Sequence, residues 1–337
     1  MRILFDYNNL ACRCAHIQQV RSDDERGWSL MAYMVFNTMY NFLSDVAESL
    51  DVANTGEKLD VILALDSKDG YWRREFYPPY KADRSAKRSN DGLDWERAYT
   101  EFDRLSSTIQ RCIPWKVLCV DKCEADDIIY TLAVTSSEPV IIHSSDSDYL
   151  QLVSDNVSLF RPNIADYVEF PCVCKISNSD VFCKTSEEYL QYAILTGQGG
   201  KDNVYNVKTD TNWCVTQAKR KPGFGVKAAS KVLATADYIQ ELQRIGLWEN
   251  YLRNKRLIDM SELPEEYRCS ILHSYETTVL PTPSITTLLD VYPWASLAAQ
   301  VSELEATLQM WSEGIRFNKE QHIEVPSAEP IAMEFSL

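Results

Sequence analysis

The chain of 337 residues lacks the features of a membrane protein or a structural zinc protein. It contains no run of eighteen or more apolar residues, which excludes a membrane-spanning helix. Its four histidines are scattered and no two cysteines have the Cys-x-x-Cys spacing, so a structural zinc site is not expected. The first residues form an apolar strand pattern that ends in Asp6, which is not the pattern of a signal peptide.

Cysteine is not scarce, but its presence does not indicate disulfides. The ten cysteines belong to a chain that is long enough to bury an ordinary hydrophobic core and that has no secretory signal. Reduced thiols and a cytoplasmic location are therefore expected. Internal repeats and low-complexity blocks are also lacking, and the length allows one large α/β domain or two modest ones.

Acidic residues follow four stretches that are typical of buried β-strands, and helical patterns separate these stretches. We therefore predict an α/β fold whose mostly parallel central sheet is covered by helices on both faces. In such a sheet the residues after the strands converge on one edge. The expected strands are 3–5, 61–65, 117–120 and 140–143, and the acids that follow them are Asp6, Asp66, Glu124, Asp126, Asp127, Asp146 and Asp148.

So many carboxylates at one edge indicate a cation site. Any single acid among them has an ordinary alternative explanation, because Asp and Glu are favoured at helix N-termini. Capping does not easily account for acids at four strand ends, two of them in clusters. Carboxylates that gather repel one another unless cations neutralise them, and oxygen ligands suit hard ions such as Mg²⁺ or Mn²⁺. The pattern favours a two-metal site that cleaves phosphodiesters.

The net charge of −15 taken alone argues against a nucleic-acid partner, but the basic residues are not spread evenly. They gather in two segments, and an acidic protein with basic stripes can still bind phosphates, with strong salt dependence. One segment holds Arg73, Arg74, Lys81, Arg84, Lys87 and Arg88, and the other holds Lys219, Arg220, Lys221, Lys227 and Lys231.

Two segments have both a functional and an ordinary interpretation. Residues 67–94 are polar, basic and aromatic, with Pro78 and Pro79 breaking any helix, which fits a functional loop or a merely solvated one. Residues 222–229 place Gly223 and Gly225 before an alanine-rich helix. Such a start can bind a phosphate through backbone N–H groups, or can be an ordinary turn.

Five motifs, in this order and spacing, give the chain a family resemblance. It resembles the flap endonuclease / 5′-nuclease superfamily over nearly its whole length, and is similar to the branch that contains the ribonuclease H of T-even phages, which is also a 5′→3′ exonuclease. The motifs are the runs 66–74, 79–84, 121–127, 144–148 and 201–204.

The resemblance implies a role for each matching residue. Lys81 would approach the scissile phosphate with Arg73 or Arg74 nearby, and Tyr80 would stack on a base. The first metal would be held, directly or through water, by Asp6, Asp66, Glu124, Asp126 and Asp146. The second metal and its waters would be held or oriented by Asp127, Asp148 and Asp202. Both ions would be Mg²⁺, which Mn²⁺ can replace.

The resemblance also implies a division of the chain and a set of partners. Residues 1–185 would form the nuclease domain, with 67–94 as an arch or bridge. Residues 186–317 would form a helical duplex-binding domain, and 318–337 a flexible tail. The substrates would be RNA–DNA hybrids and flapped or nicked duplexes met in DNA replication, and the protein a monomer, in the host cytoplasm if phage-encoded.

Duplex contacts are expected mainly from a helix–three-turn–helix element within residues 188–234. In the predicted duplex-binding set, Arg84 comes from the arch and the other members from this element. Those members are Lys219, Arg220, Lys221, Gly223, Gly225, Lys227 and Lys231.

One position departs from the family pattern. Gly199 stands where the family has an acid of the second metal site, and Gln198 or a solvent molecule could substitute for part of it. A catalytically impaired nucleic-acid-binding protein is therefore the alternative function. The proline-bearing tail ends in the apolar run 331–337, which fits a docking peptide for a sliding clamp or single-strand-binding protein, or a tail that is disordered or packs on its own domain.

Overall fold

The computed structural model describes residues 1–18, 24–84, 88, 92–210 and 222–316. Its centre is a six-stranded sheet in the order β3-β2-β1-β4-β5-β6, in which only the β5–β6 pair is antiparallel. The mostly parallel sheet predicted from the apolar runs is confirmed. The strands are β1 (Arg2–Asp6), β2 (Asp60–Leu65), β3 (Lys116–Cys119), β4 (Val140–His143), β5 (Val157–Arg161) and β6 (Asp166–Val168).

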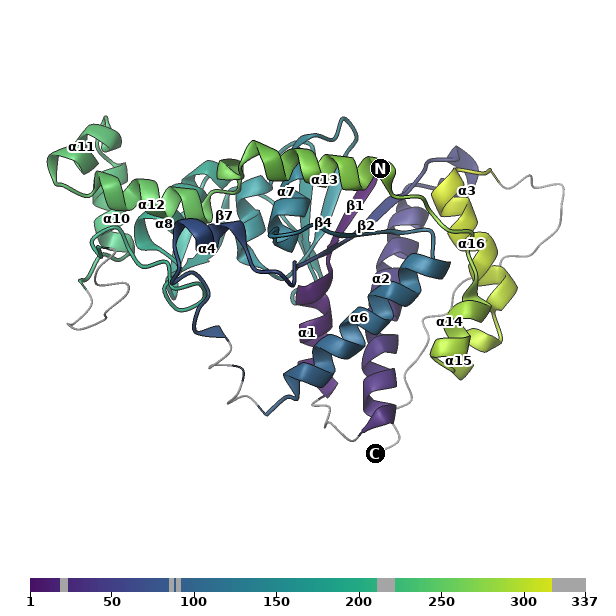
Figure 1. The fold of residues 1–337 in the computed structure, drawn as a ribbon. Coiled ribbons are helices and arrows are strands. Elements are labelled where there is room, and N and C mark those ends of the chain that lie inside the picture. Colours follow the sequence, from purple (N-terminus) through teal and green to yellow (C-terminus); the bar gives the residue numbers. More distant parts are fainter. Residues whose placement is uncertain (19–23, 85–87, 89–91, 211–221, 317–337) are drawn as a thin grey trace.

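Helices cover both faces of the sheet (Figure 1) because alternate strand residues point to opposite sides. In β1, Leu4 packs into the core on one face, while Ile3 and Phe5 pack into the core on the other. The first face is covered by α7 (Ala125–Val134) and α13 (Glu265–Thr277), and α8 (Ser186–Thr196) packs beside them against η1 (Ser147–Leu152). The second is covered by α1 (Tyr7–Gln18), α2 (Glu25–Ser49) and α6 (Trp95–Cys112).

Side-chain caps explain where several of these helices begin. The carboxylate of Asp24 accepts a hydrogen bond from the Gly27 amide at the start of α2, over 2.8 Å. Asp94 does the same for Arg97 at the start of α6, over 3.0 Å. Each cap satisfies an N–H group that has no partner within the helix.

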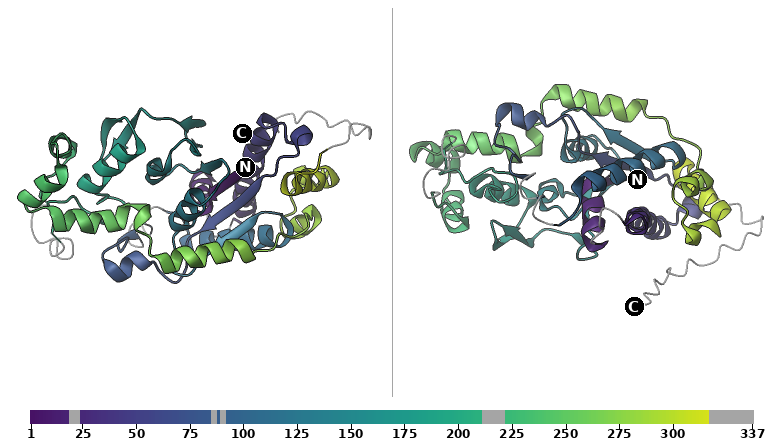
Figure 2. Two further views of the ribbon diagram at one scale, coloured as in Figure 1. Left: turned by 90° about the horizontal axis from the view of Figure 1, so that it is seen from above. Right: turned by 60° about the horizontal axis from the view of Figure 1, so that its bottom comes forward.

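The remaining elements extend the molecule at its two ends (Figure 2). At one end lie the hairpin β7 (Cys172–Ile176) and β8 (Ser179–Cys183), together with α10 (Val226–Leu233), α11 (Tyr238–Arg244) and α12 (Trp248–Ile258). At the other end lie α14 (Ile285–Val291), α15 (Ala295–Ala298) and α16 (Val301–Glu313). The short helices are α3 (Val52–Thr55), α4 (Trp72–Phe76), η1 (Ser147–Leu152) and η2 (Met260–Glu262).

The last helices pack on the α/β part of the chain. Ile285 and Leu304 belong to the same apolar core as Ile3 and Phe5, and Ile271 of α13 joins the core on the opposite face. Residues 265–316 therefore contribute to the core of the sheet. The division into 1–185, 186–317 and 318–337 stays a prediction, and the tail lies outside the described residues.

The segment after β4 forms the 3-10 helix η1, which begins directly after Asp146. Each of the nine cysteines within the described ranges is free. None of the described helices has the length and apolar character needed to cross a membrane.

Candidate active site

Four carboxylates from four strand ends line one cleft. Asp6 closes β1 opposite Ala64, so Asp66 lies just beyond it at the end of β2. Asp126 stands in the first turn of α7, and Asp146 is the N-cap of η1. The four side chains line a cleft of about 220 Å³, which we call the acidic cleft. The convergence expected at the carboxyl edge of the sheet occurs for these four acids.

Neighbouring donors fix the orientation of these carboxylates. Each of three acids accepts a hydrogen bond from a group on an adjacent element, which leaves the other lone pairs of the carboxylate for a ligand. The bonds run from Ser144 Oγ to Asp6 Oδ2 over 2.9 Å, from the Ala125 amide to Asp66 Oδ1 over 2.9 Å, and from the Tyr149 hydroxyl to Asp126 Oδ1 over 2.8 Å.

Burial and mutual repulsion disfavour negative charge in the acidic cleft. Desolvation, with the charges of Asp146 and Asp66, raises the pKa of Asp6 to about 7. Desolvation also raises the pKa of Asp66, and raises that of Asp126 well above its usual value. A divalent cation would relieve both causes, because it replaces the lost water and neutralises the charge.

The chemistry of this donor set fits a hard divalent cation, although the carboxylates stand apart. Among the described residues, no three His, Cys, Asp or Glu side chains are close enough together to hold a metal ion as they stand. The repulsion that raises the pKa of Asp6 also favours separated carboxylates. Asp6, Asp66, Asp126 and Asp146 would have to turn toward one another to bind an ion directly.

The pKa of Asp6 predicts a pH-dependent stability in the absence of metal. An unfolded aspartate ionises near 3.8 and the folded Asp6 near 7, so between these values only the folded state keeps the proton. The contribution of Asp6 to stability therefore falls as pH rises through this range. Asp6→Asn lacks this loss. The free energy of unfolding of the variant minus that of wild type should therefore rise by on the order of 2 kcal/mol between pH 5 and pH 8.

Urea denaturation in EDTA at several pH values measures this difference. Taking the difference between variant and wild type removes the contribution of His143, whose burial lowers its pKa to about 4. A difference between the two proteins that stays constant with pH would contradict the assigned pKa of Asp6.

Basic side chains also line the acidic cleft. They are Lys81, Arg84, Arg88 and Lys201, and the lining further includes Asn8, Asn9, Cys12 and Tyr99. Of these, only Lys81 and Arg84 were predicted as site residues. Arg88 lay in a recognised basic segment, and the guanidinium of Arg88 stacks on Trp95, 4.8 Å from the ring centre. Lys201 could have been found from its place directly before Asp202.

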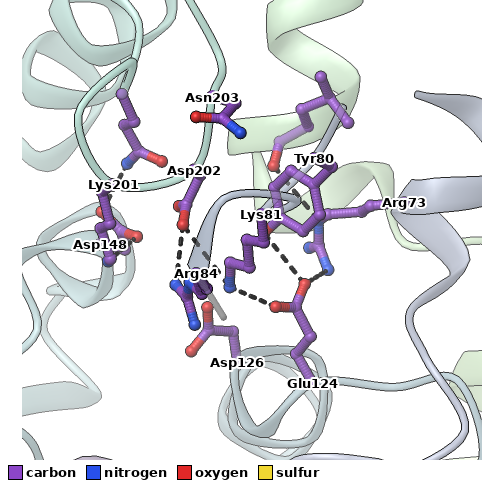
Figure 3. A network of polar contacts seen from close by, with 12 residues as sticks. Arg73, Tyr80, Lys81, Arg84, Glu124, Asp126, Asp148, Lys201, Asp202 and Asn203 are labelled. Carbon is purple, nitrogen blue, oxygen red and sulfur yellow. Dashed lines mark hydrogen bonds and ion pairs between the residues drawn. The ribbon is translucent and has the colours of Figure 1, made fainter. Parts of the chain in front are cut away.

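Glu124 lies outside the acidic cleft, in a buried network of cations (Figure 3). Arg73 Nη1 is 2.9 Å from Glu124 Oε2, the Tyr80 hydroxyl donates to the same oxygen over 3.0 Å, and Lys81 Nζ contacts the other oxygen. Lys81 and Arg73 outweigh the desolvation of the group and lower the pKa of Glu124 to about 2. Direct binding of the first metal ion by Glu124 would require Arg73 or Lys81 to move, and its place in the first metal set stays a prediction.

Asp127 is a structural residue in this fold. It is 0% exposed. Its carboxylate accepts from the Glu124 amide over 2.9 Å and from Trp72 Nε1 over 3.1 Å, and pairs with Arg73 at 2.9 Å. These contacts match the alternative explanation by helix capping, and the second-metal role of Asp127 stays a prediction.

Arg73, Arg74 and Tyr80 are engaged in contacts within the protein, and their predicted roles stay predictions. Arg73 and Tyr80 are each 3% exposed, so Arg73 cannot meet a phosphate and the Tyr80 ring cannot stack on a base without unpacking. Arg74 donates through Nε to the Tyr80 carbonyl over 3.0 Å and through Nη2 to the Lys81 carbonyl over 3.2 Å. Arg74 therefore positions the backbone of Lys81, whose φ of 54° is left-handed.

Asp202 faces the arch. It is buried, with Arg84 Nη2 2.8 Å and Lys81 Nζ 3.9 Å from its Oδ1. The Lys81 amide also donates to the Asp202 carbonyl over 3.0 Å. Figure 3 shows Lys81 between Asp202 and Glu124. Asp202 therefore holds the segment 67–94 against the loop after α8.

Asp148 contacts two residues of that same loop. Lys201 Nζ lies 2.6 Å from Asp148 Oδ2 and 2.6 Å from Asp146 Oδ2, and Gln198 Nε2 donates to Asp148 Oδ1 over 2.6 Å. Desolvation and the charge of Asp146 raise the pKa of Asp148 to about 6. The charge of Asp202 acts in the same direction on Asp148, whereas Asp127 is paired with Arg73 in the buried network.

The predicted duplex-binding residues are only partly described. Lys227 and Lys231 are exposed on α10, and Gly223 and Gly225 precede that helix and are exposed as well. Lys219, Arg220 and Lys221 lie outside the described residues. The helix–three-turn–helix element stays a prediction, since residues 211–221 separate its described parts, α8 and α10.

A larger cavity, of about 640 Å³, lies elsewhere in the fold. It is formed by α2, α6 and the segment 291–296, on the side of the sheet away from α8. The acidic cleft is the smaller of the two, yet it collects the residues from the strand ends. We therefore assign the chemistry to the acidic cleft.

Comparison with known proteins identifies the class. The family model described as the 5′-3′ exonuclease N-terminal resolvase-like domain matches residues 2–182. The chain belongs to this 5′-3′ exonuclease family, within the flap endonuclease / 5′-nuclease superfamily, and is a nuclease of that class. This confirms the resemblance read from the sequence motifs.

Individual relatives agree with this assignment. The chain is 25% identical to ribonuclease H of Enterobacteria phage T4 over 285 residues, covering 82% of this chain and 87% of the T4 protein. It is 26% identical to DNA polymerase I of Mycobacterium bovis over 246 residues, which is 71% of this chain and 23% of the polymerase. The similarity to the polymerase therefore concerns a minor part of that enzyme.

Solved structures share the fold. A T5 5′-exonuclease with bound zinc ions matches with a TM-score of 0.52 at 17% identity, over 82% of this chain and 100% of that one. The T5 flap endonuclease in a complex with DNA and metal ions matches with a TM-score of 0.51 at 17% identity, over 82% and 99% of the two chains.

Proposed function

We propose that this protein is a divalent-metal-dependent 5′ nuclease that removes RNA primers and 5′ flaps during DNA replication, in a phage. The convergence of Asp6, Asp66, Asp126 and Asp146 on one basic-rimmed cleft carries the proposal. The structural relatives crystallised with divalent metal ions and with DNA support it. We infer Mg²⁺ as the ion, with Mn²⁺ as a substitute, because the donors are all hard oxygens.

The reaction is hydrolysis of a phosphodiester. A water oxygen bonds to phosphorus, the bond to the 3′ oxygen breaks, and the products carry a 5′-phosphate and a 3′-hydroxyl. When bound, a divalent cation supplies Lewis-acid polarisation of the phosphoryl oxygens. Asp6, Asp66, Asp126 and Asp146 would hold it, and Lys81 and Arg84, at the rim of the cleft, would face the negative charge of the phosphate.

Substrate selection follows from the surroundings of the acidic cleft. Arg84 and Arg88 lie on its arch side, so a single-stranded 5′ end would pass beside the arch. The exposed Lys227 and Lys231 on α10 would contact the phosphates of the adjoining duplex. Duplex affinity should therefore fall with rising salt concentration. A sliding clamp or single-strand-binding protein remains the proposed partner of the tail.

Lys81→Ala should lower turnover by about a hundredfold, which is typical for loss of one electrostatic contact in a transition state. Duplex affinity should change little, because Lys81 is only 6% exposed. Single-turnover cleavage at saturating enzyme separates the two effects. Lys68→Ala is the matched control, since Lys68 lies in the same segment but is 71% exposed and pairs with Asp103.

A thermal melt of each variant is also needed, because Lys81 supports the buried Glu124. A folded Lys81→Ala protein that binds weakly but turns over normally would make Lys81 a substrate-positioning residue.

The proposed function is tested by cleavage of labelled substrates. A 5′-flap duplex, an RNA–DNA hybrid and a blunt duplex without flap are incubated with the protein in Mg²⁺ and in EDTA. We expect cleavage of the first two in Mg²⁺ only, with 5′-phosphate ends on the products. Tight binding without cleavage of any substrate would favour the alternative, a nucleic-acid-binding protein that has lost activity.

A further inference from the structure

Lys201 contacts Asp146 and Asp148, one acid from each of the two predicted metal sets. We propose that the ammonium group of Lys201 replaces the second metal ion, so that the enzyme binds a single divalent cation. This inference rests on the proposed function, because it concerns the same active site.

The contacts of Lys201 are those of a cation shared between two carboxylates. Its Nζ lies 2.8 Å and 2.6 Å from the two oxygens of Asp146 and 2.6 Å from Asp148 Oδ2. The ammonium group of Lys201 therefore forms charge-assisted hydrogen bonds to both acids.

The remaining ligands expected of a second metal ion are already engaged. Asp127 is paired with Arg73, and Asp202 is paired with Arg84. The other oxygen of Asp148 accepts a hydrogen bond from the side-chain Nε2 of Gln198 over 2.6 Å. A second ion beside Asp148 would have to displace Lys201 and to compete with Arg84 for Asp202.

The loop that carries Lys201 is built without room for the missing acid. The backbone N–H of Gln198 donates to the Val204 carbonyl over 2.6 Å, and the backbone N–H of Lys201 donates to the Gln198 carbonyl over 3.1 Å. These two hydrogen bonds close the turn. A Cβ added at Gly199 would lie 2.6 Å from Cδ1 of the Tyr205 ring. An aspartate at 199 therefore requires Tyr205 to move, so Gly199→Asp is a poor way to restore the site.

Gln198 and Lys201 offer a better way. Gln198→Glu is isosteric and turns the donor that faces Asp148 into a carboxylate. Lys201→Met removes the charge and keeps most of the chain length, and Lys201 is 40% exposed, so the fold should tolerate it. The double variant thus exchanges the built-in cation for a third carboxylate beside Asp146 and Asp148.

Counting bound Mn²⁺ by electron paramagnetic resonance, without nucleic acid, tests the proposal. Wild type should bind one ion, and the double variant two. Two adjacent ions, about 4 Å apart in two-metal sites, should also give a spin-coupled spectrum that wild type lacks. Lys201→Arg, which keeps the charge, and Lys208→Met, which removes an exposed charge from the same loop, should each bind one ion.

Each other outcome is informative. Two ions on wild type, or one ion on the double variant, would overturn the role of Lys201. No ion on wild type would contradict the metal site of the proposed function as well. If wild type binds two ions and cleaves the flap in Mg²⁺, the proposed nuclease function stands and only the inference about Lys201 is contradicted. One bound ion without cleavage of any substrate would remove the function alone.

Discussion

Asp146→Asn should lower the rate of cleavage by at least about a thousandfold, because a ligand of the proposed cation and a charge that orders the cleft are lost together. The fold should survive the change. Asp146 is the N-cap of η1 and accepts from the Asp148 amide over 3.0 Å, and asparagine caps equally well. Duplex binding should stay the same or improve, because a charge that repels phosphate has been removed.

Asp121→Asn is the matched control for this substitution. Asp121 is exposed in the turn after β3, so it undergoes the same change of charge outside the acidic cleft. The measurement is single-turnover cleavage of a 5′ flap, with affinity from a binding titration in Ca²⁺ or EDTA. If Asp146→Asn cleaves at nearly the wild-type rate in Mg²⁺, Asp146 holds no essential cation.

Arg73→Gln should lower the free energy of unfolding by about 3–5 kcal/mol, the usual cost of removing one partner from a buried ion pair. The Arg73 side chain is 3% exposed and lies between Glu124 at 2.9 Å and Asp127 at 2.9 Å. Its removal leaves Asp127 buried with no cation beside it. Urea denaturation of wild type and variant gives the difference directly.

Arg74 provides the comparison for Arg73. It is the next residue in α4 but is exposed, and its guanidinium donates to backbone carbonyls of the arch. Arg74→Gln should therefore cost about 1 kcal/mol, close to the value of an ordinary hydrogen bond. Equal losses for the two variants would show that Arg73 is no more important to the fold than a surface arginine.

The sequence predicted the sheet because its strands are continuous apolar runs that carry their own signal. Val140–His143 is buried throughout, and the acids after β1, β2 and β4 follow from strand direction alone. The same reasoning placed Asp6, Asp66, Asp126 and Asp146 together. These residues lie where any parallel sheet brings its strand ends.

The partners of the remaining acids depended on tertiary contacts that no local pattern contains. Glu124 and Asp127 are neighbours of Asp126 in sequence, yet α7 turns them toward the arch, where Arg73 neutralises them. A helix places successive side chains on different faces, so a run of acids need not share a site. The role of Lys201 likewise depends on the conformation of its loop, which no local sequence pattern predicts.

The dependence of flap cleavage on Mg²⁺ tests the central claim most directly. Single-turnover rates on a labelled 5′-flap duplex are measured as Mg²⁺ is titrated into metal-free protein, with EDTA as the zero point. The account predicts no cleavage in EDTA and a rate that rises to saturation with Mg²⁺, for wild type but not for Asp146→Asn. Undiminished cleavage in EDTA would contradict it.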